Sequence, residues 1–182
     1  MTVMSPITQG TTSRFFPRVC TCRKQKLVLY AKVLESAVRA MKLLGPGMSE
    51  KAYEQHMFYS LYCNNIATAT QFHVYSPQEH TCKPPILCGI LDMLVQSKIL
   101  VELKANQRRI NSNHIEQVMR YYDVMQKKPM EGKLSSIEQD DDTLLAIVIN
   151  FTQINSQNVV QIWNNATKKH ETLYVDKIVL RD

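Results

Sequence analysis

Two acidic residues and a lysine stand near the middle of the chain, in Asp92 and in the run Glu102-Leu103-Lys104. Apolar residues surround them, and a buried charge is costly unless it is paired or bound. Carboxylates brought within about 5 Å across two strands repel each other unless a cation lies between them, and Mg²⁺ prefers such oxygen ligands. The residue types therefore indicate a divalent-cation site. The alternative is that both acids pair with neighbouring lysines at the rim of a sheet.

The turn between two expected strands decides whether these carboxylates meet. A two-residue turn pairs Val95 with Lys98, and Asp92 then faces away from Glu102. A three-residue turn pairs Val95 with Ile99 and sets Asp92 directly across from Glu102. Only the second register places both carboxylates on one face of the sheet.

Hydrophobic periodicity predicts a mixed α/β fold, with a small sheet flanked by helices. Apolar residues recur at helical spacing in three segments, and six shorter apolar runs have the composition of strands. We expect one domain over residues 26–182, with a polar, acidic loop at 127–142. Helices are expected at 26–44, from just after Gly47 to Cys63, and at 113–126, and strands at 68–75, 86–95, 98–105, 144–151, 159–163 and 172–179.

The net charge of +6 over 182 residues is unevenly distributed. Residues 1–34 contain six basic and no acidic residues, which leaves 16 of each in the rest of the chain. We interpret residues 1–25 as a flexible basic arm, although an acid-free start with arginines also fits a mitochondrial presequence. Five irregularly spaced cysteines favour an intracellular location, in the nucleus or cytoplasm, or in the mitochondrion if the arm is a presequence. No apolar run is long enough to cross a membrane.

Four sequence motifs follow one another along the chain. Gly47-Met48-Ser49-Glu50-Lys51-Ala52-Tyr53 matches the pattern GxxExxY, and it is followed by GILDMLVQSKILVELKA, HIEQVMRYYDVM and LLAIVINF. Over roughly residues 26–163, the chain resembles the GxxExxY family, a branch of the PD-(D/E)XK, RecB-like nuclease superfamily. The resemblance implies a PD-(D/E)XK nuclease-like fold.

The resemblance also implies roles for individual residues. Glu50, Asp92 and Glu102 would be the catalytic carboxylates that bind Mg²⁺ or Mn²⁺, and Lys104 would position or activate the attacking water. Each of the seven further candidates named next also fits an ordinary structural or solvent-exposed role. Supporting roles are implied for Tyr53, Gln117 and Tyr121, and contacts with nucleic acid are expected for Lys98, Arg108, Arg109 and Arg120.

These residue types suit phosphodiester hydrolysis. A bound divalent cation stabilises charge on phosphoryl oxygens and supplies hydroxide at neutral pH. We therefore expect a metal-dependent nuclease that acts on DNA, with RNA as another substrate to test. One position departs from the family pattern, because Ile90 stands where members often carry an arginine. A catalytically inactive nuclease fold that binds nucleic acid or protein is the alternative.

Overall fold

A six-stranded sheet in the sequential order β1 to β6 forms the centre of the protein. The computed structural model describes residues 22–76, 85–126 and 144–180, and every structural statement below concerns these ranges. The predicted mixed α/β architecture is confirmed. The elements are α1 (Cys22–Leu44), α2 (Glu50–Cys63), β1 (Thr68–Tyr75), β2 (Leu87–Val95), β3 (Ile99–Ala105), α3 (Ser112–Gln126), β4 (Leu145–Ile154), β5 (Gln157–Asn164), β6 (His170–Tyr174) and a short 3-10 helix, Val175–Lys177.

The start of the first helix differs from the sequence expectation. Helix α1 begins at Cys22, ahead of the expected start at Lys26, because the residues between them contain no proline or glycine and include good helix formers. The end of the expected 1–25 arm is therefore helical. The rest of the arm and the acidic 127–142 loop lie outside the described residues.

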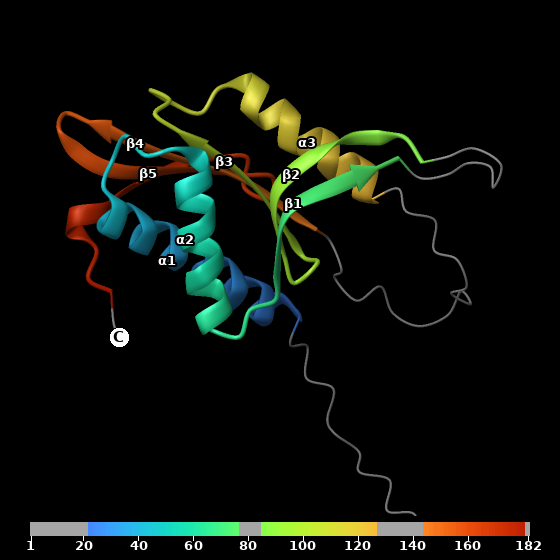
Figure 1. Ribbon diagram of the computed structural model, residues 1–182, viewed down its shortest axis with the longest axis horizontal. Helices are drawn as coiled ribbons and strands as arrows, with labels where there is room; N and C mark the ends of the chain where they lie inside the picture. The colour runs from blue at the N-terminus through green and yellow to red at the C-terminus, as the bar shows by residue number, and fades with distance from the viewer. Residues whose placement is uncertain (1–21, 77–84, 127–143, 181–182) are drawn as a thin grey trace, which may run out of the picture.

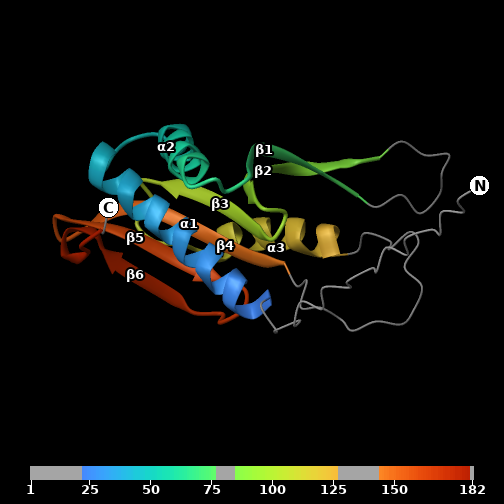
Figure 2. The same ribbon diagram turned by 90° about the horizontal axis from the view of Figure 1, so that it is seen from below.

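Helices cover both faces of the sheet. Helices α1 and α2 pack on one face and α3 packs on the other, as Figures 1 and 2 show. Strands β3 and β4 are parallel and are connected through α3, whereas the other neighbouring strands are antiparallel. Strands β1 and β2 extend past the rest of the sheet as a two-stranded arm.

Side chains of β3 alternate between the two faces. Val101 and Leu103 join the core beneath α1 and α2, and Leu100 joins the core beneath α3. Glu102 and Lys104 are therefore on the α3 side of the sheet. The two charged residues share a face with an apolar core, Glu102 buried and Lys104 slightly exposed.

The β2–β3 hairpin has the register that a three-residue turn produces. Val95 pairs with Ile99, and Met93 pairs with Val101. The sequence left this register and that of a two-residue turn open, and the structure decides between them. The ladder ends at this last pair, so β2 and β3 separate at Asp92.

A capped helix start positions the first acidic candidate. Gly45 and Gly47 have positive φ angles of 71° and 84°, which end α1 and turn the chain. Ser49 then caps α2, and its hydroxyl accepts a hydrogen bond from the Ala52 N–H at 3.3 Å. Glu50 is consequently the first residue of α2.

Within the three described ranges, no helix combines the length and the apolar character needed to cross a membrane.

Candidate active site

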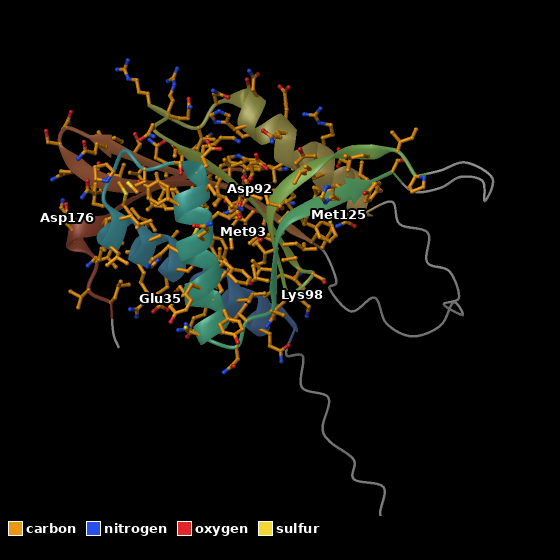
Figure 3. All side chains as sticks on the ribbon, in the orientation of Figure 1. Glu35, Asp92, Met93, Lys98, Met125 and Asp176 are labelled. Carbon is orange, nitrogen blue, oxygen red and sulfur yellow. The ribbon has the colours of Figure 1, made fainter. Side chains whose placement is uncertain are left out.

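Asp92 lies at the point where β2 and β3 part, near the middle of the molecule (Figure 3). Its Oδ2 accepts a hydrogen bond from the backbone N–H of Leu103 at 2.7 Å. In a continued ladder, a backbone carbonyl of β2 would accept such a bond. The carboxylate of Asp92 therefore takes the place of the missing strand partner.

Glu102 is the most deeply buried carboxylate of the site, with 1% of the residue exposed. Its Oε1 accepts a hydrogen bond from Lys104 Nζ at 2.7 Å, and this ion pair is itself mostly buried. Its Oε2 is buried and has no hydrogen-bond partner. A buried carboxylate oxygen without a partner is costly, and a proton or a cation would relieve the cost.

Glu50 joins the same end of β3 from helix α2. Its Oε1 accepts a hydrogen bond from the Ala105 N–H at 3.2 Å. Beside it, Asn106 Nδ2 donates to the Met48 carbonyl at 3.1 Å. The start of α2 is thus tied to the end of β3.

The charges of these groups act on one another. Burial, followed by the charge of Asp92, raises the pKa of Glu102 to about 7, and Lys104 opposes this shift. Burial also raises the pKa of Asp92, partly offset by the hydrogen bond from Leu103. Burial works against the charged form of Lys104, but Glu102, Glu50 and Asp92 together outweigh it and raise the pKa of the lysine. All four predicted catalytic residues therefore form one electrostatic unit.

Tyr53 supports the helix that carries Glu50. Its ring is fully buried and stacks on Phe151 of β4, with ring centroids 4.0 Å apart. Its hydroxyl donates to the Gly45 carbonyl at 2.6 Å, across the loop that precedes α2. This placement fits the predicted supporting role by holding α2 against the sheet.

The other two supporting candidates belong to α3, which covers the face of the sheet that Glu102 and Lys104 share. Tyr121 is buried and packs against Gly89, where an added Cβ would come within 2.5 Å of the tyrosine hydroxyl oxygen. Gln117 is half-buried one turn earlier. Tyr121 thus contacts β2 at Gly89, three residues before Asp92.

Two of the predicted nucleic-acid contacts lie beside the site. Arg108 and Arg109 are exposed in the loop that follows β3. Asn150 Nδ2 donates to the Gln107 carbonyl at 2.9 Å, and Gln161 Nε2 donates to the Arg108 carbonyl at 3.4 Å. These two hydrogen bonds hold the loop at the end of β3 that carries Lys104. Lys104 pairs with Asn150 in the β3–β4 ladder.

The structure does not bring Lys98 to the site. It lies in the turn at the opposite end of β3, about 20 Å along the strand from Lys104 at the usual rise per residue; Figure 3 labels it well away from Asp92. Arg120 is exposed on α3, between the buried positions Val118 and Tyr121, so it faces away from the sheet. The spacing of motifs along the chain had placed Lys98 too close to the carboxylates.

Three further polar residues near the site were missed. Glu54 is 3% exposed, pairs with Lys51 and Gln71, and contributes to the raised pKa of Asp92. Burial, followed by the charge of Lys104, lowers the pKa of His114 in the first turn of α3. Helical spacing from Glu50 could have identified Glu54, because residues four apart share a helix face. Gln71 and His114 carry no comparable sequence signal.

The carboxylates fit a divalent cation in part. Across the described ranges, no three His, Cys, Asp or Glu side chains are grouped as a complete metal-binding set. Mg²⁺, however, is usually held by one or two carboxylates and retains several waters. Asp92 and Glu102 meet that requirement, and the unpartnered Oε2 of Glu102 supplies a ligand atom.

The comparisons with known proteins point to one family. A family model described as the PD-(D/E)XK nuclease superfamily matches residues 28–132, more than half of the chain. The matched segment includes all four residues of the electrostatic unit. No curated protein and no solved structure matches the chain.

Proposed function

The chain belongs to the PD-(D/E)XK nuclease superfamily, and we propose that it is a metal-dependent nuclease of the GxxExxY branch that hydrolyses phosphodiester bonds in DNA. Members of the superfamily generally use divalent metals, and Mg²⁺ or Mn²⁺ is proposed here. The observation that carries the proposal is the buried, unpartnered Oε2 of Glu102 beside Asp92 and Lys104. A carboxylate left in that state is suited to binding a cation.

Asp92 and Glu102 would hold the cation, with Glu50 as a third acidic neighbour. A divalent cation bound there would stabilise negative charge on the phosphoryl group and lower the pKa of a bound water. The backbone N–H groups of Leu103 and Ala105 fix one oxygen each of Asp92 and Glu50, which leaves the second oxygen of each carboxylate for other contacts.

Lys104 would act next to the reacting phosphate. Its ammonium is held by Glu102, and the surrounding carboxylates keep it protonated. A fixed positive charge in a partly buried site stabilises charge that develops in the transition state. Lys104 would therefore position the attacking water or neutralise the phosphoryl oxygens.

Arg108 and Arg109 would hold the substrate. Both are exposed in the loop that Asn150 and Gln161 fix beside Lys104. Arginines bind phosphate oxygens through parallel hydrogen bonds. Because the chain after residue 34 has equal numbers of acidic and basic residues, these local charges matter more than the net charge.

The test is a cleavage assay with a direct measurement of metal binding. End-labelled single-stranded DNA, duplex DNA and RNA are incubated with the full-length protein and Mg²⁺ or Mn²⁺, and calorimetry measures the affinity of each cation. We expect cleavage of DNA by the wild type and its loss in Glu102→Gln and Lys104→Met. Glu35→Gln, which alters two partly exposed ion pairs on α1, is the matched control. Absence of cleavage of every substrate, or full activity of both site variants, contradicts the proposal.

A non-catalytic binding module is the second candidate. It is favoured by Ile90, which is 41% exposed where relatives often have an arginine, and by the incomplete set of metal ligands among the described residues. A binding module need not take up a cation at Asp92 and Glu102. Retained nucleic-acid binding without any calorimetric signal for Mg²⁺ or Mn²⁺ would favour this alternative.

A further inference from the structure

Gln71 has an unusual backbone conformation for a residue inside a strand. Its φ angle is +51°, in the left-handed region that residues with a side chain rarely adopt. The other described non-glycine residues with positive φ lie outside the helices and strands. Such a conformation costs on the order of 1 kcal/mol or more and persists only where surrounding contacts enforce it.

The register places Gln71 directly across from Asp92. Thr70 pairs with Met93, and Phe72 pairs with Leu91, so the intervening residues face each other. Met93 packs in the core beneath α1 and α2, whereas Leu91, two residues earlier, packs in the core beneath α3. In a regular strand, residues two apart share a face. The hairpin therefore reverses its faces at Gln71 and Asp92.

This reversal explains the orientation of Asp92. Its Oδ2 accepts the hydrogen bond from the Leu103 N–H, so the side chain is directed toward β3. The left-handed residue on β1 allows that strand to follow the reversal of β2 while the pairing continues on both sides. The position of the Asp92 carboxylate thus depends on the backbone of Gln71.

A partly buried hydrogen bond fixes Gln71, an exposed residue, to helix α2. Its Nε2 donates to Oε2 of Glu54 at 2.5 Å, and the other oxygen of Glu54 accepts from Lys51 Nζ at 2.5 Å. Glu54 is 3% exposed, and hydrogen bonds to a charged acceptor are stronger than neutral ones. Glu54 lies one turn after Glu50, so one helix holds both an acidic candidate and the tether to the strand opposite Asp92.

We propose that Glu54 and Gln71 are positioning residues that set the Asp92 carboxylate for cation binding. The inference rests on the proposed function for its metal but not for its geometry. The tether enforces the left-handed backbone at Gln71, which maintains the reversal at Asp92 and its hydrogen bond to Leu103. The side chains of both residues bond to each other, and Glu54 also pairs with Lys51, so both would act through the backbone opposite Asp92.

Three variants of the full-length protein separate positioning from stability. Gln71→Gly removes the tether but accepts the positive φ without strain. Glu54→Ala removes the acceptor, and Glu54→Gln restores an oxygen that can accept from Gln71. Gln153→Ala is the matched control, because it removes a side-chain amide bond of 3.1 Å to Asn158 in the β4–β5 hairpin.

The readouts are Mn²⁺ affinity by electron paramagnetic resonance, amide hydrogen exchange of Leu103 by NMR without metal, and Tm. We expect Gln71→Gly and Glu54→Ala to lose about tenfold or more in Mn²⁺ affinity, the range seen when partners of metal ligands are removed. The Leu103 amide should exchange faster in both, whereas Glu54→Gln and Gln153→Ala should remain close to wild type. Gln71→Gly should keep a near-native Tm, because glycine offsets part of the lost bond.

Unchanged Mn²⁺ affinity and unchanged Leu103 exchange in Gln71→Gly would overturn the inference. A loss that tracks Tm equally in all variants, the Gln153→Ala control included, would overturn it too, because it would indicate general destabilisation. If wild type itself binds no Mn²⁺, the proposed function fails instead. The Leu103 exchange rates of Gln71→Gly and Glu54→Ala then decide the positioning role alone.

Discussion

Replacing Glu102 by glutamine should stabilise the metal-free protein. Glu102 is 1% exposed, and one of its oxygens has no partner. Its neighbours include the carboxylate of Asp92, which disfavours a second negative charge. Glutamine has nearly the same shape as the protonated acid and carries no charge. The variant should therefore avoid the cost of burying a carboxylate that a cation would otherwise bind.

The magnitude follows from the pKa of Glu102, which is raised from 4.5 to about 7 in the folded protein. Each pKa unit corresponds to about 1.4 kcal/mol, so the charged side chain reduces the free energy of unfolding by about 3 kcal/mol above neutral pH. At about pH 5, where the folded protein keeps the proton, the reduction should be about 1 kcal/mol or less.

The sign of the pH dependence is determined by which state holds the proton more tightly. The folded state keeps the Glu102 proton up to about pH 7, whereas the unfolded chain releases it near its ordinary value of 4.5. The contribution of Glu102 is therefore fully present below the unfolded pKa and is lost as pH rises through the folded pKa. Glutamine does not titrate, so the advantage of Glu102→Gln should grow between about pH 5 and about pH 8.

Urea unfolding in the presence of a chelator measures this difference at several pH values. Added Mg²⁺ or Mn²⁺ should then stabilise the wild type and leave Glu102→Gln unchanged. Glu35→Gln should differ from wild type by only about 0.5 kcal/mol, as is usual for a surface position. If Glu102→Gln is no more stable than wild type at about pH 8, the buried charge of Glu102 does not lower the free energy of unfolding as its burial implies.

Three other variants test separate parts of the site. Lys104→Met should retain Mn²⁺ binding, measured by calorimetry, but lose cleavage by about a hundredfold or more, because it removes a charge near the reacting phosphate without removing a metal ligand; equal loss of both would assign Lys104 to the metal. Substituting Arg108 and Arg109 together by alanine should weaken DNA binding and lower the slope of log affinity against log salt by about two, if each contacts one phosphate; an unchanged slope in fluorescence anisotropy titrations would remove both from the interface. Gly89→Ala should lower the free energy of unfolding by about 1–3 kcal/mol, since its Cβ would meet the Tyr121 ring and its φ of +153° disfavours a side chain; a near-native Tm would show that α3 can shift.

Local patterns were sufficient to predict most of the elements and to reduce the β2–β3 hairpin to two possible registers, one for each turn length. Strand Thr68–Tyr75 has the expected bounds, and β3 differs from expectation only at its first residue. Alternation along β3 also placed Glu102 and Lys104 on one face. These features depend on the two-residue period of a strand, which can be read from neighbouring residues. The turn length that selects the register could not be read in this way.

The remaining features depend on contacts between distant segments. The hydrogen bond from Gln71 to Glu54 spans 17 positions, and no local pattern predicts a left-handed residue inside β1. Lys98 shows a related limit, because it is close to Glu102 in sequence but lies at the other end of β3, and its contact with nucleic acid stays a prediction. Periodicity predicts which face a residue occupies and gives no information about the tertiary position of the strand's ends.

The separation of β2 and β3 at Asp92 links the site to the stability of the fold. The N–H groups of Leu103 and Ala105 project from β3 where β2 no longer pairs, and they are satisfied by Asp92 and Glu50. A buried N–H without a partner costs about 1–3 kcal/mol. Asp92→Ala should therefore be less stable than Asp92→Asn by about 1–3 kcal/mol, because asparagine can still accept from Leu103.

Both Asp92 variants should lose affinity for Mn²⁺, because neither offers a carboxylate. Urea unfolding gives the difference in stability, and calorimetry gives the difference in affinity. Equal stability of Asp92→Ala and Asp92→Asn would mean that water or a shifted β2 satisfies the Leu103 N–H. The backbone N–H groups of Leu103 and Ala105 need acceptors where β2 no longer pairs with β3, and the carboxylates of Asp92 and Glu50 supply them. The same hydrogen bonds hold these acidic side chains in an apolar region before any cation is bound.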